Sequence, residues 1–300
     1  MKAEKRPNKL FRNMASKIAL SPMMATVVFV FIGCTLWTIA YSLTNSRTLP
    51  TPDFVRDFAG FAQYERLFGT RRWKISVKNL EIFGLLSLTF MFVVGFLLAV
   101  FMDQKIRFEN TFRTIFLYPF ALSFVITGIV WAWMLNPAFG LQKSIRDLGW
   151  TSFSFDWVAN TKMVIYTLVI AAVWQGTGLM MALMLAGLRG IDDEIWKASR
   201  VDGIPKWRTY IFIVIPMMRP VFITALVIFA AGAVRTYDLA VAMTGGGPGI
   251  ASQLPTLYIY EYMFTSYLSQ GLAASTVLLA TVAIVVVPWA FYEFGRRRPT

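Results

Sequence analysis

Long apolar runs constrain this chain more than any other feature. The first is uncharged from Ser21 to Thr44, and an apolar run of more than about 20 residues is long enough to cross a bilayer as a helix. Ala40-Tyr41-Ser42 offers a small-x-small cleavage site, but the apolar region of a signal peptide covers only about 7 to 15 residues. We therefore expect this run to remain on the protein as a membrane span.

Further runs of this kind follow, and together they predict an all-α integral membrane protein with six spans. The expected spans are at about residues 21–44, 82–102, 112–135, 163–188, 221–243 and 272–291. They form a transmembrane domain at 21–293, between a basic N-terminal segment at 1–20 and a basic tail at 294–300. Most of the 29 Lys and Arg residues fall in segments that this arrangement places in the cytoplasm. Because cytoplasmic loops of membrane proteins carry the excess of positive charge, we expect both termini on that side.

Composition supports a membrane protein and excludes several other classes. Hydrophobic residues make up 57% of the chain and charged residues only 15%, against about 25% charged residues in soluble domains. The net charge of +13 does not predict nucleic-acid binding, because the cations gather at the ends of apolar runs and not along one surface. We expect membrane lipid, and no nucleic acid, among the partners.

Residues for enzymatic or metal chemistry are scarce. The chain has no His, and its single cysteine, Cys34, lies inside an apolar run, where we expect it to be packed or lipid-facing. No phosphate-binding loop, zinc-protease motif or nucleophile elbow is present. Asp238 is the only acid inside a predicted span, apart from Glu81 at a boundary, so an intramembrane protease lacks its residues. We expect no catalytic, metal or cofactor site in this chain.

Two local features modify the predicted spans. Pro119 lies in the third span, and a proline inside a helix removes a backbone hydrogen bond and usually kinks the helix. Trp73 lies among Arg71, Arg72 and Lys74, a composition that suits a helix at the membrane surface. We therefore expect a kinked third span and a short interfacial helix before the second span.

The longest polar interruption in the C-terminal half, residues 188–220, has the pattern of a helix, a turn and a second helix. Acidic residues at 192–194 are followed by bases one and two turns later, an order that complements the helix dipole. Gly203 favours a turn, and Pro205 can open a second helix at its first position. The stretch is either a compact knob for a groove on a partner protein or an ordinary cytoplasmic loop.

In this stretch the chain resembles the permeases of binding-protein-dependent ABC importers. Their cytoplasmic signature reads E-A-A, three residues, G, nine residues, I-x-L-P. The same spacing is found in Lys197-Ala198-Ser199, three residues, Gly203, nine residues and Ile213-Val214-Ile215-Pro216. Lys197 replaces the glutamate of the signature, which reverses a charge, and Ile215 replaces its leucine.

Three loops extend the resemblance to the sugar-type permeases, a group that includes the maltose and glycerol-phosphate importers. The loops are FAGFAQYERLF, NPAFGLQKSIRDLGW and AMTGGGPGIASQLPTLYIYEYMF, and the likeness covers roughly residues 55–295. It implies alternating access in a bacterial inner membrane, powered by a dimer of separate ATPase subunits that hold ATP and Mg. It also implies a second permease, expected as a heterodimer partner, and a periplasmic or lipid-anchored binding protein that delivers the substrate.

The same resemblance assigns the contact with the ATPase to residues 188–220. The residues expected to couple to the ATPase are Asp193, Glu194, Trp196, Lys197, Ala198, Ser199, Val201, Asp202, Gly203 and Pro216. The first helix, Asp193 to Val201, is the expected plug, Gly203 is its turn, and Ile213 to Pro216 is the link to the moving span.

Polar side chains in the fourth and fifth spans are candidates for the substrate pathway, because such groups are costly inside a membrane. Gln175 and Thr177 suit sugar hydroxyls, and Trp174 either stacks on a sugar ring or packs against protein or lipid. Arg235 and Asp238 lie three residues apart, hence on one helix face, as a structural pair or as a substrate contact. Including positions that match the maltose permease, the expected pathway residues are Trp174, Gln175, Gly176, Thr177, Phe229, Gly232, Ala233, Arg235, Tyr237 and Asp238.

These features together predict the permease subunit of an ABC importer for a mono- or oligosaccharide or a polyol derivative. An anionic glycerol-phosphate or sugar-acid cargo, which Arg235 would suit, is the alternative within transport. A membrane scaffold or receptor without a transport role is the alternative from another class.

Overall fold

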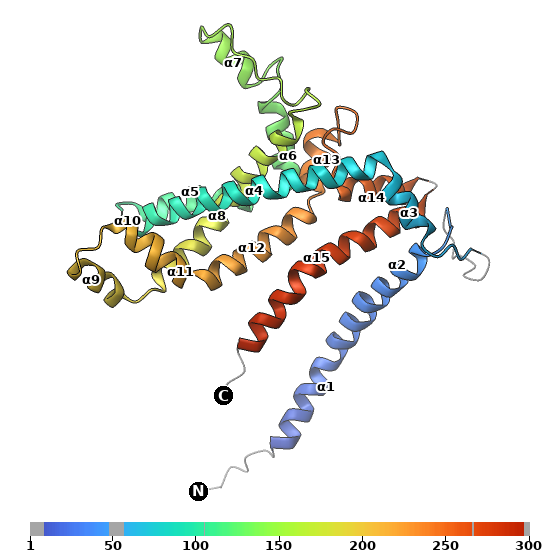
Figure 1. Cartoon of the computed structure of the whole chain (residues 1–300), viewed down its shortest axis with the longest axis horizontal. Coiled ribbons are helices and arrows are strands. Elements are labelled where there is room, and N and C mark those ends of the chain that lie inside the picture. The colour runs from blue at the N-terminus through green and yellow to red at the C-terminus, as the bar shows by residue number, and fades with distance from the viewer. Residues whose placement is uncertain (1–8, 48–56, 105, 266, 297–300) are drawn as a thin grey trace. The chain divides into compact units, whose positions relative to one another are not determined.

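The computed structural model describes residues 9–47, 57–104, 106–265 and 267–296, which are predominantly helical (Figure 1). Within them the only extended pairing is an isolated bridge between Thr44 and Phe58. The all-α fold expected from the apolar runs is therefore confirmed. Parts of the two basic segments, residues 1–8 and 297–300, lie outside the described residues.

The helices divide between two compact units, residues 1–67 with 262–276 and residues 68–261 with 277–300. Two elements, η1 and η2, are π-helical turns that continue the helices before them. The bounds are α1 Lys9–Val27, η1 Val28–Gly33, α2 Cys34–Ser42, α3 Ala62–Gly69, α4 Arg71–Asp103, α5 Glu109–Ala121, α6 Phe124–Met134, α7 Leu141–Asp147, α8 Val164–Arg189, α9 Asp193–Val201, α10 Lys206–Arg208, η2 Thr209–Val214, α11 Ile215–Met217, α12 Arg219–Val234, α13 Asp238–Thr244, α14 Pro255–Phe264 and α15 Leu268–Arg296.

The first unit contains the first predicted span. α1, η1 and α2 follow one another as an apolar helix whose large side chains are exposed, among them Phe29 at 80% and Phe31 at 73%, which suits a lipid environment. Beyond α2, the Oγ1 of Thr44 lies 3.1 Å from the Oγ of Ser269, and Ser269 donates to the carbonyl of Ser46 at 2.8 Å. These bonds fasten the end of the N-terminal helix to the first turn of α15.

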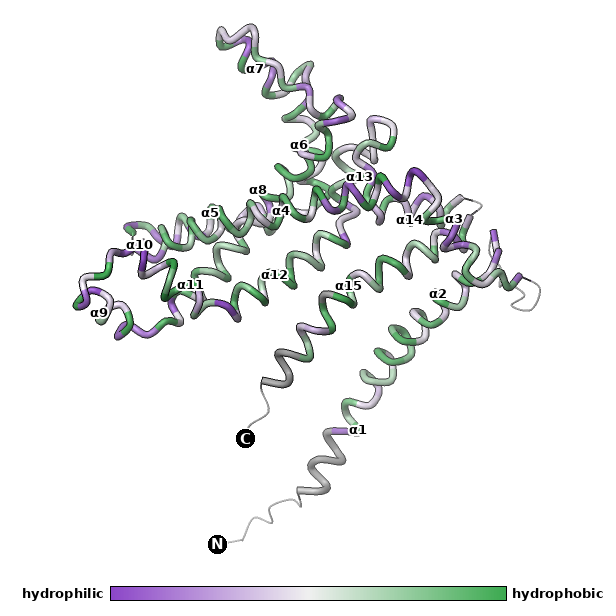
Figure 2. Tube along the Cα trace, viewed as in Figure 1, coloured by the Kyte–Doolittle hydropathy of each residue, from purple (hydrophilic) through white to green (hydrophobic). Residues whose placement is uncertain are grey.

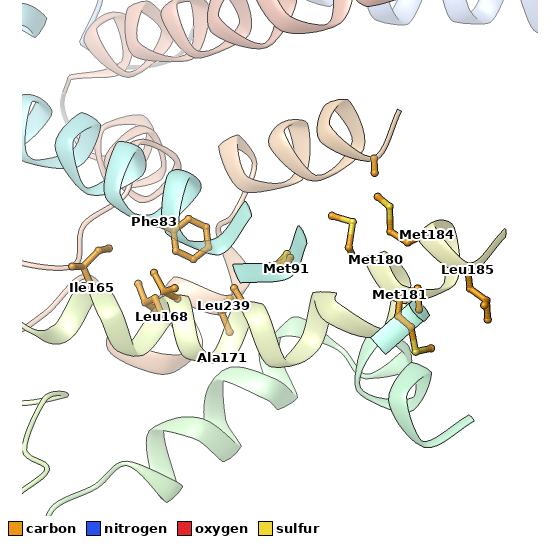
Figure 3. Close-up of a cluster of buried hydrophobic side chains, with 14 of the residues drawn as sticks. Phe83, Met91, Ile165, Leu168, Ala171, Met180, Met181, Met184, Leu185 and Leu239 are labelled. Atoms are coloured by element: carbon orange, nitrogen blue, oxygen red, sulfur yellow. The ribbon is translucent and has the colours of Figure 1, made fainter. Parts of the chain in front are cut away.

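The core of the second unit is the contact between α4 and α8. Figure 2 shows hydrophobic residues along both helices and hydrophilic residues around α9, and methionines from both helices belong to the buried cluster at their contact (Figure 3). A Cβ at Gly95 of α4 would lie 2.8 Å from the Cβ of Met180 in α8, and one at Gly178 of α8 would overlap the carbonyl of Phe116 in α5. Small residues therefore let these helices approach closely, as is typical of membrane proteins.

Two bends interrupt the apolar helices of this unit. α5 and α6 meet at 96°, and the helical segment Lys206–Met217 meets α12 at 69°. The expected kink at Pro119 is a complete break three residues later, where Ser123 caps α6 by accepting a bond from the Val125 nitrogen at 3.2 Å. The described residues hold four helices long and apolar enough to span a membrane, or six if each bent pair is one span. That number is consistent with the six predicted spans.

α4 begins at Arg71, well before Ile82, where the second span was expected to start. Trp73 is 3% exposed and packs edge-on against Tyr258, with ring centroids 5.3 Å apart, while Arg72 forms a 2.7 Å ion pair with Glu261. The prediction of a separate interfacial helix at Trp73 is therefore wrong. The partners of these side chains belong to α14, more than 180 residues later in the chain, and a local pattern does not reveal them.

Candidate functional site

A cavity of about 320 Å³ lies between α4, α8, α12 and the break that follows α12, with Phe120 and Phe124 closing it from α5 and α6. Most of its lining is apolar or aromatic. The cavity brings together most of the residues expected from sequence to form a substrate pathway, namely Gln175, Gly176, Phe229, Gly232, Ala233, Arg235, Tyr237 and Asp238. Their role in binding a substrate stays a prediction, but their gathering around one space makes that role physically possible.

Gln175 is the most buried polar residue from the predicted set, at 2% exposed. Its Nε2 donates to the carbonyl of Leu122 at 2.8 Å, at the break between α5 and α6. The next residue, Gly176, is where α4 and α12 approach α8, because an added Cβ would lie 2.7 Å from the Cε of Met91 and 3.2 Å from the Cε1 of Phe229. A side chain at Gly176 would therefore push apart two walls of the cavity.

Trp174 and Thr177 do not line the cavity. Trp174 is 40% exposed and lies edge-on to Trp131, with ring centroids 5.9 Å apart. Thr177 donates its hydroxyl to the carbonyl of Val173 at 2.6 Å, so its donor is satisfied within α8. The structure thus favours the interpretation that Trp174 packs against the protein, and not that it stacks on a sugar in this cavity.

Arg235 and Asp238 do not share a helix face, in contrast to the expectation from their spacing. α12 ends at Val234 and α13 begins at Asp238, so the fifth predicted span is interrupted between them. Thr256 supports the interruption by donating its hydroxyl to the carbonyl of Thr236. In the described part of the chain no ion pair joins Arg235 to Asp238. The intervening residues are not helical, and the three-residue spacing therefore does not bring the two side chains together.

Sequence reasoning missed the wall that α4 contributes. Phe83, Ser87 and Met91 line the cavity at intervals of four residues, which is the spacing of one helix face. Ser87 is 2% exposed. The sequence signal for this wall was a polar residue, Ser87, four residues from an apolar residue on either side. A serine inside an apolar span is too common to identify a cavity wall by itself.

At the other end of this unit lies the stretch 188–220, which we call the coupling element after the role that the signature predicts for it. Asp192 caps α9 by accepting a bond from the Glu194 nitrogen at 3.0 Å. At its C-terminal end Gly203 adopts a φ of +67°, and the Ile204 nitrogen reaches the carbonyl of Ser199 at 3.0 Å, a closing pattern that needs a left-handed residue. The expected helix and glycine turn are present, and their contact with an ATPase stays a prediction.

α9 presents a mixed surface. Ser199 is buried and Trp196 packs edge-on against Tyr210, with centroids 5.3 Å apart. Val201 is 87% exposed. The other predicted contact residues that are exposed are Asp193, Glu194, Lys197, Ala198, Asp202, Gly203 and Pro216. One side of α9 is thus held by the protein, and the other is free for a partner.

The coupling element is joined to the cavity through one helical segment. Lys206–Met217 leads from the glycine turn into α12, which carries Phe229 and Gly232 of the cavity wall. Behind α9, Arg189 at the end of α8 forms a 2.6 Å ion pair with Glu109 at the start of α5 and lies 3.9 Å from Asp103 at the end of α4. These contacts bring three helix ends together beside α9.

Similarity to known proteins extends over most of the chain. The profile of the family described as binding-protein-dependent transport system inner membrane component matches residues 91–298. A probable ABC transporter permease protein of Pyrococcus horikoshii is 33% identical over 89% of this chain and 91% of its own length. The trehalose/maltose transport system permease protein of Thermococcus litoralis is 26% identical over 94% of this chain and 93% of its own.

A solved structure has the same fold. In the crystal structure of a bacterial ABC transporter involved in the import of the acidic polysaccharide alginate, one chain matches with a TM-score of 0.76 at 19% identity, over 97% of this chain and 100% of that one. The family match covers more than half of the present sequence and includes α8, the coupling element and α12. The chain therefore belongs to the family of inner-membrane components of binding-protein-dependent transport systems.

Proposed function

We propose that this chain is the permease subunit of an ATP-driven importer and that a carbohydrate crosses the membrane through the cavity between α4, α8 and α12. The cavity is the observation that supports this most strongly, because its 320 Å³ are lined by aromatic and apolar residues with a few polar groups among them. Sites for small molecules have this composition. A relative named for trehalose and maltose supports a sugar as the cargo.

The coupling element supports a mechanism of alternating access. α9 has an exposed side, and Lys206–Met217 joins it to a helix of the cavity wall. When a partner ATPase moves α9, this segment transmits the movement to α12, and the cavity opens toward the other face of the membrane. ATP and Mg belong to the ATPase subunits in this proposal, and the present chain performs no hydrolysis.

The family membership supports the remaining partners. The chain is a multi-pass component of the inner membrane, and we place both of its termini in the cytoplasm. A second permease completes a heterodimer, two ATPase subunits dock on the coupling elements, and a periplasmic or lipid-anchored binding protein delivers the cargo. Membrane lipid surrounds the apolar helices.

An anionic cargo is a second candidate, and Arg235 is the observation that favours it. Arg235 lines the cavity, its side chain is exposed, and it makes no ion pair with any residue of the described chain. A guanidinium group in that position can bind a phosphate or a carboxylate through two parallel hydrogen bonds. A glycerol phosphate or a sugar acid would use it, whereas a neutral sugar would not need its charge.

Uptake by the complete transporter tests the proposal. The chain is reconstituted in proteoliposomes with the partner permease, ATPase and binding protein of its own system, and ATP-dependent uptake of maltose, trehalose, xylose and sn-glycerol 3-phosphate is measured. We expect accumulation of at least one of them, and we expect deletion of residues 193–202 to abolish uptake and co-purification of the ATPase. Unchanged uptake after that deletion would contradict the proposal and favour a scaffold.

Arg235→Ala and Arg235→Lys separate the two cargo classes. For an anionic cargo, the alanine variant should lose about tenfold or more in uptake and the lysine variant less, because lysine retains the charge. For a neutral sugar, the two variants should behave alike. Equal losses for both kinds of cargo would remove charge recognition by Arg235 from the proposal.

A further inference from the structure

Two residues that line the cavity, Ser87 and Gln175, each carry a buried polar atom, the Oγ and the Oε1, that has no hydrogen-bond partner within the part of the chain that the structure describes. Both side chains are 2% exposed. A buried polar atom without a partner costs about 1–3 kcal/mol, and such atoms are uncommon in folded proteins. Two such unpaired atoms in residues of a cavity wall are explained if a molecule that enters the cavity forms the missing hydrogen bonds with them.

The orientation of the Gln175 amide is determined by its other partner. Its nitrogen donates to the carbonyl of Leu122, and a carbonyl oxygen accepts hydrogen bonds only. The amide oxygen is therefore the atom left without a partner in the described chain, and this oxygen is also only an acceptor. Whatever lies opposite Gln175 must donate a hydrogen bond, as a hydroxyl does and an ionised carboxylate or phosphate does not.

Ser87 differs from the other hydroxyl residues of α4. Ser76 donates to the carbonyl of Arg72, and Thr89 donates to that of Leu85, each four residues earlier and at 2.8 Å. This is the usual way in which a helix satisfies such a side chain. Ser87 makes no such bond, so its hydroxyl is available both to donate and to accept.

The two free atoms belong to helix segments that meet. Met91, one turn after Ser87, is the residue that an added Cβ at Gly176 would touch, and Gly176 follows Gln175 directly. Figure 3 shows Phe83 and Met91 of α4 facing α8 on either side of this region. The polar atoms are thus set in an aromatic and apolar surface, whereas the charged residues of the cavity, Arg235 and Asp238, are exposed.

We propose that Ser87 is a ligand-binding, specificity-determining residue, and that Ser87 and Gln175 together select a cargo that presents hydroxyl groups to this buried wall. The inference rests on the proposed transport function and adds to it a chemical requirement. A hydroxyl opposite Gln175 satisfies both partners, whereas a carboxylate or phosphate there would place two acceptors against each other. A site that binds a hydroxyl discriminates strongly against an analogue that lacks it, because the protein group is then left unpaired.

Kinetics of the complete transporter test this requirement. The probe is the compound among maltose, trehalose, xylose and sn-glycerol 3-phosphate that the wild-type transporter imports fastest. We expect Ser87→Ala to raise the KM for that probe roughly fivefold to tenfold, the size of one lost hydrogen bond. Thr89→Ala, two residues along the same helix with its hydroxyl already bonded, should leave the KM within twofold.

A labelling experiment gives a second readout that does not depend on turnover. In a Cys34→Ala background, Ser87→Cys is treated with a small cationic thiosulfonate with and without the same probe, and Thr89→Cys is the matched control. We expect the probe to slow labelling at position 87 and not at position 89. Equal KM values for the two alanine variants, together with no protection at 87, would overturn the role of Ser87 while leaving transport intact. Absence of uptake by the wild type would instead overturn the transport function on which this inference rests.

Discussion

The cavity and the coupling element are both polar regions of an apolar chain, but they are built in opposite ways. The coupling element is contiguous, and Asp192, Gly203 and Tyr210 determine its shape within a few turns of chain. The cavity takes Ser87, Gln175 and residues near Arg235 from helices far apart in sequence. The first region depends on local backbone rules, and the second depends on how closely helices pack. Substitutions should therefore damage the two regions through different mechanisms.

The largest effect should come from the packing that encloses the cavity. Gly178→Val would force a branched side chain into the carbonyl of Phe116, in the contact between α5 and α8. Overpacking costs about 1–3 kcal/mol or more, which corresponds to a fall of roughly 2–12 °C in melting temperature. Thermal unfolding of the detergent-solubilised protein measures it.

Gly84→Val is the matched control for this variant. Gly84 lies in α4, and an added Cβ there meets no atom from another described element within 4 Å. Its melting temperature should stay within about 2 °C of the wild type, the shift expected for a change below 0.5 kcal/mol. Similar losses in both variants would contradict the account, because valine would then destabilise these helices even where no close approach of α5 and α8 is affected.

A smaller effect is expected at the turn of the coupling element. Gly203 has a left-handed φ of +67°, a conformation that costs a β-branched residue about 1–2 kcal/mol. Gly203→Val should weaken binding of the ATPase subunit by roughly 5- to 30-fold, the factor equivalent to that energy, without changing the melting temperature of the cavity helices. A titration of ATPase against the reconstituted permease measures it.

Gly203→Asn distinguishes conformation from side-chain size, because asparagine tolerates the left-handed region better than valine. It should bind the ATPase more tightly than the valine variant. If both variants bound the ATPase as the wild type does, the left-handed backbone conformation at Gly203 would not matter for docking.

The smallest effect is expected at the ion pair beside the coupling element. Glu109→Gln removes the ion pair with Arg189, whose side chain is 41% exposed. Exposed ion pairs contribute only about 0.2–1 kcal/mol, so stability and uptake should change less than fivefold and in a salt-dependent manner. A loss above tenfold at moderate salt would mean that the three helix ends beside α9 transmit movement and do not merely pack.

The same contrast explains what the sequence could predict. The cap at Asp192, the turn at Gly203 and the fold of apolar helices follow from neighbours in the chain, and all three are present in the structure. For the cavity, polar side chains inside the predicted spans and the resemblance to the maltose permease identified the part of the wall that α8 and α12 provide. The wall from α4 was missed because Ser87 looks like any small residue in an apolar span.

The wrong expectations share a physical cause. Arg235 and Asp238 were expected on one helix face because the helix was assumed to be continuous. In the structure α12 ends at Val234 and α13 begins at Asp238. The helix at Trp73 was placed at a membrane surface because Tyr258, its packing partner, is remote in sequence. A residue remote in sequence contacts the chain in both places, Thr256 at the end of α12 and Tyr258 at Trp73, and no local pattern reveals such contacts.

The central claim is that one chain separates cargo recognition in the cavity from ATPase docking on α9. Gln175→Leu and Val201→Glu test it in the reconstituted transporter, with uptake and ATPase co-purification measured side by side. The account predicts that Gln175→Leu lowers uptake at least about tenfold, through loss of a buried hydrogen-bonding group, and leaves ATPase binding within twofold. It predicts that Val201→Glu, at a side chain 87% exposed, abolishes both. Loss of ATPase binding in the Gln175 variant, or full activity in the Val201 variant, would contradict it.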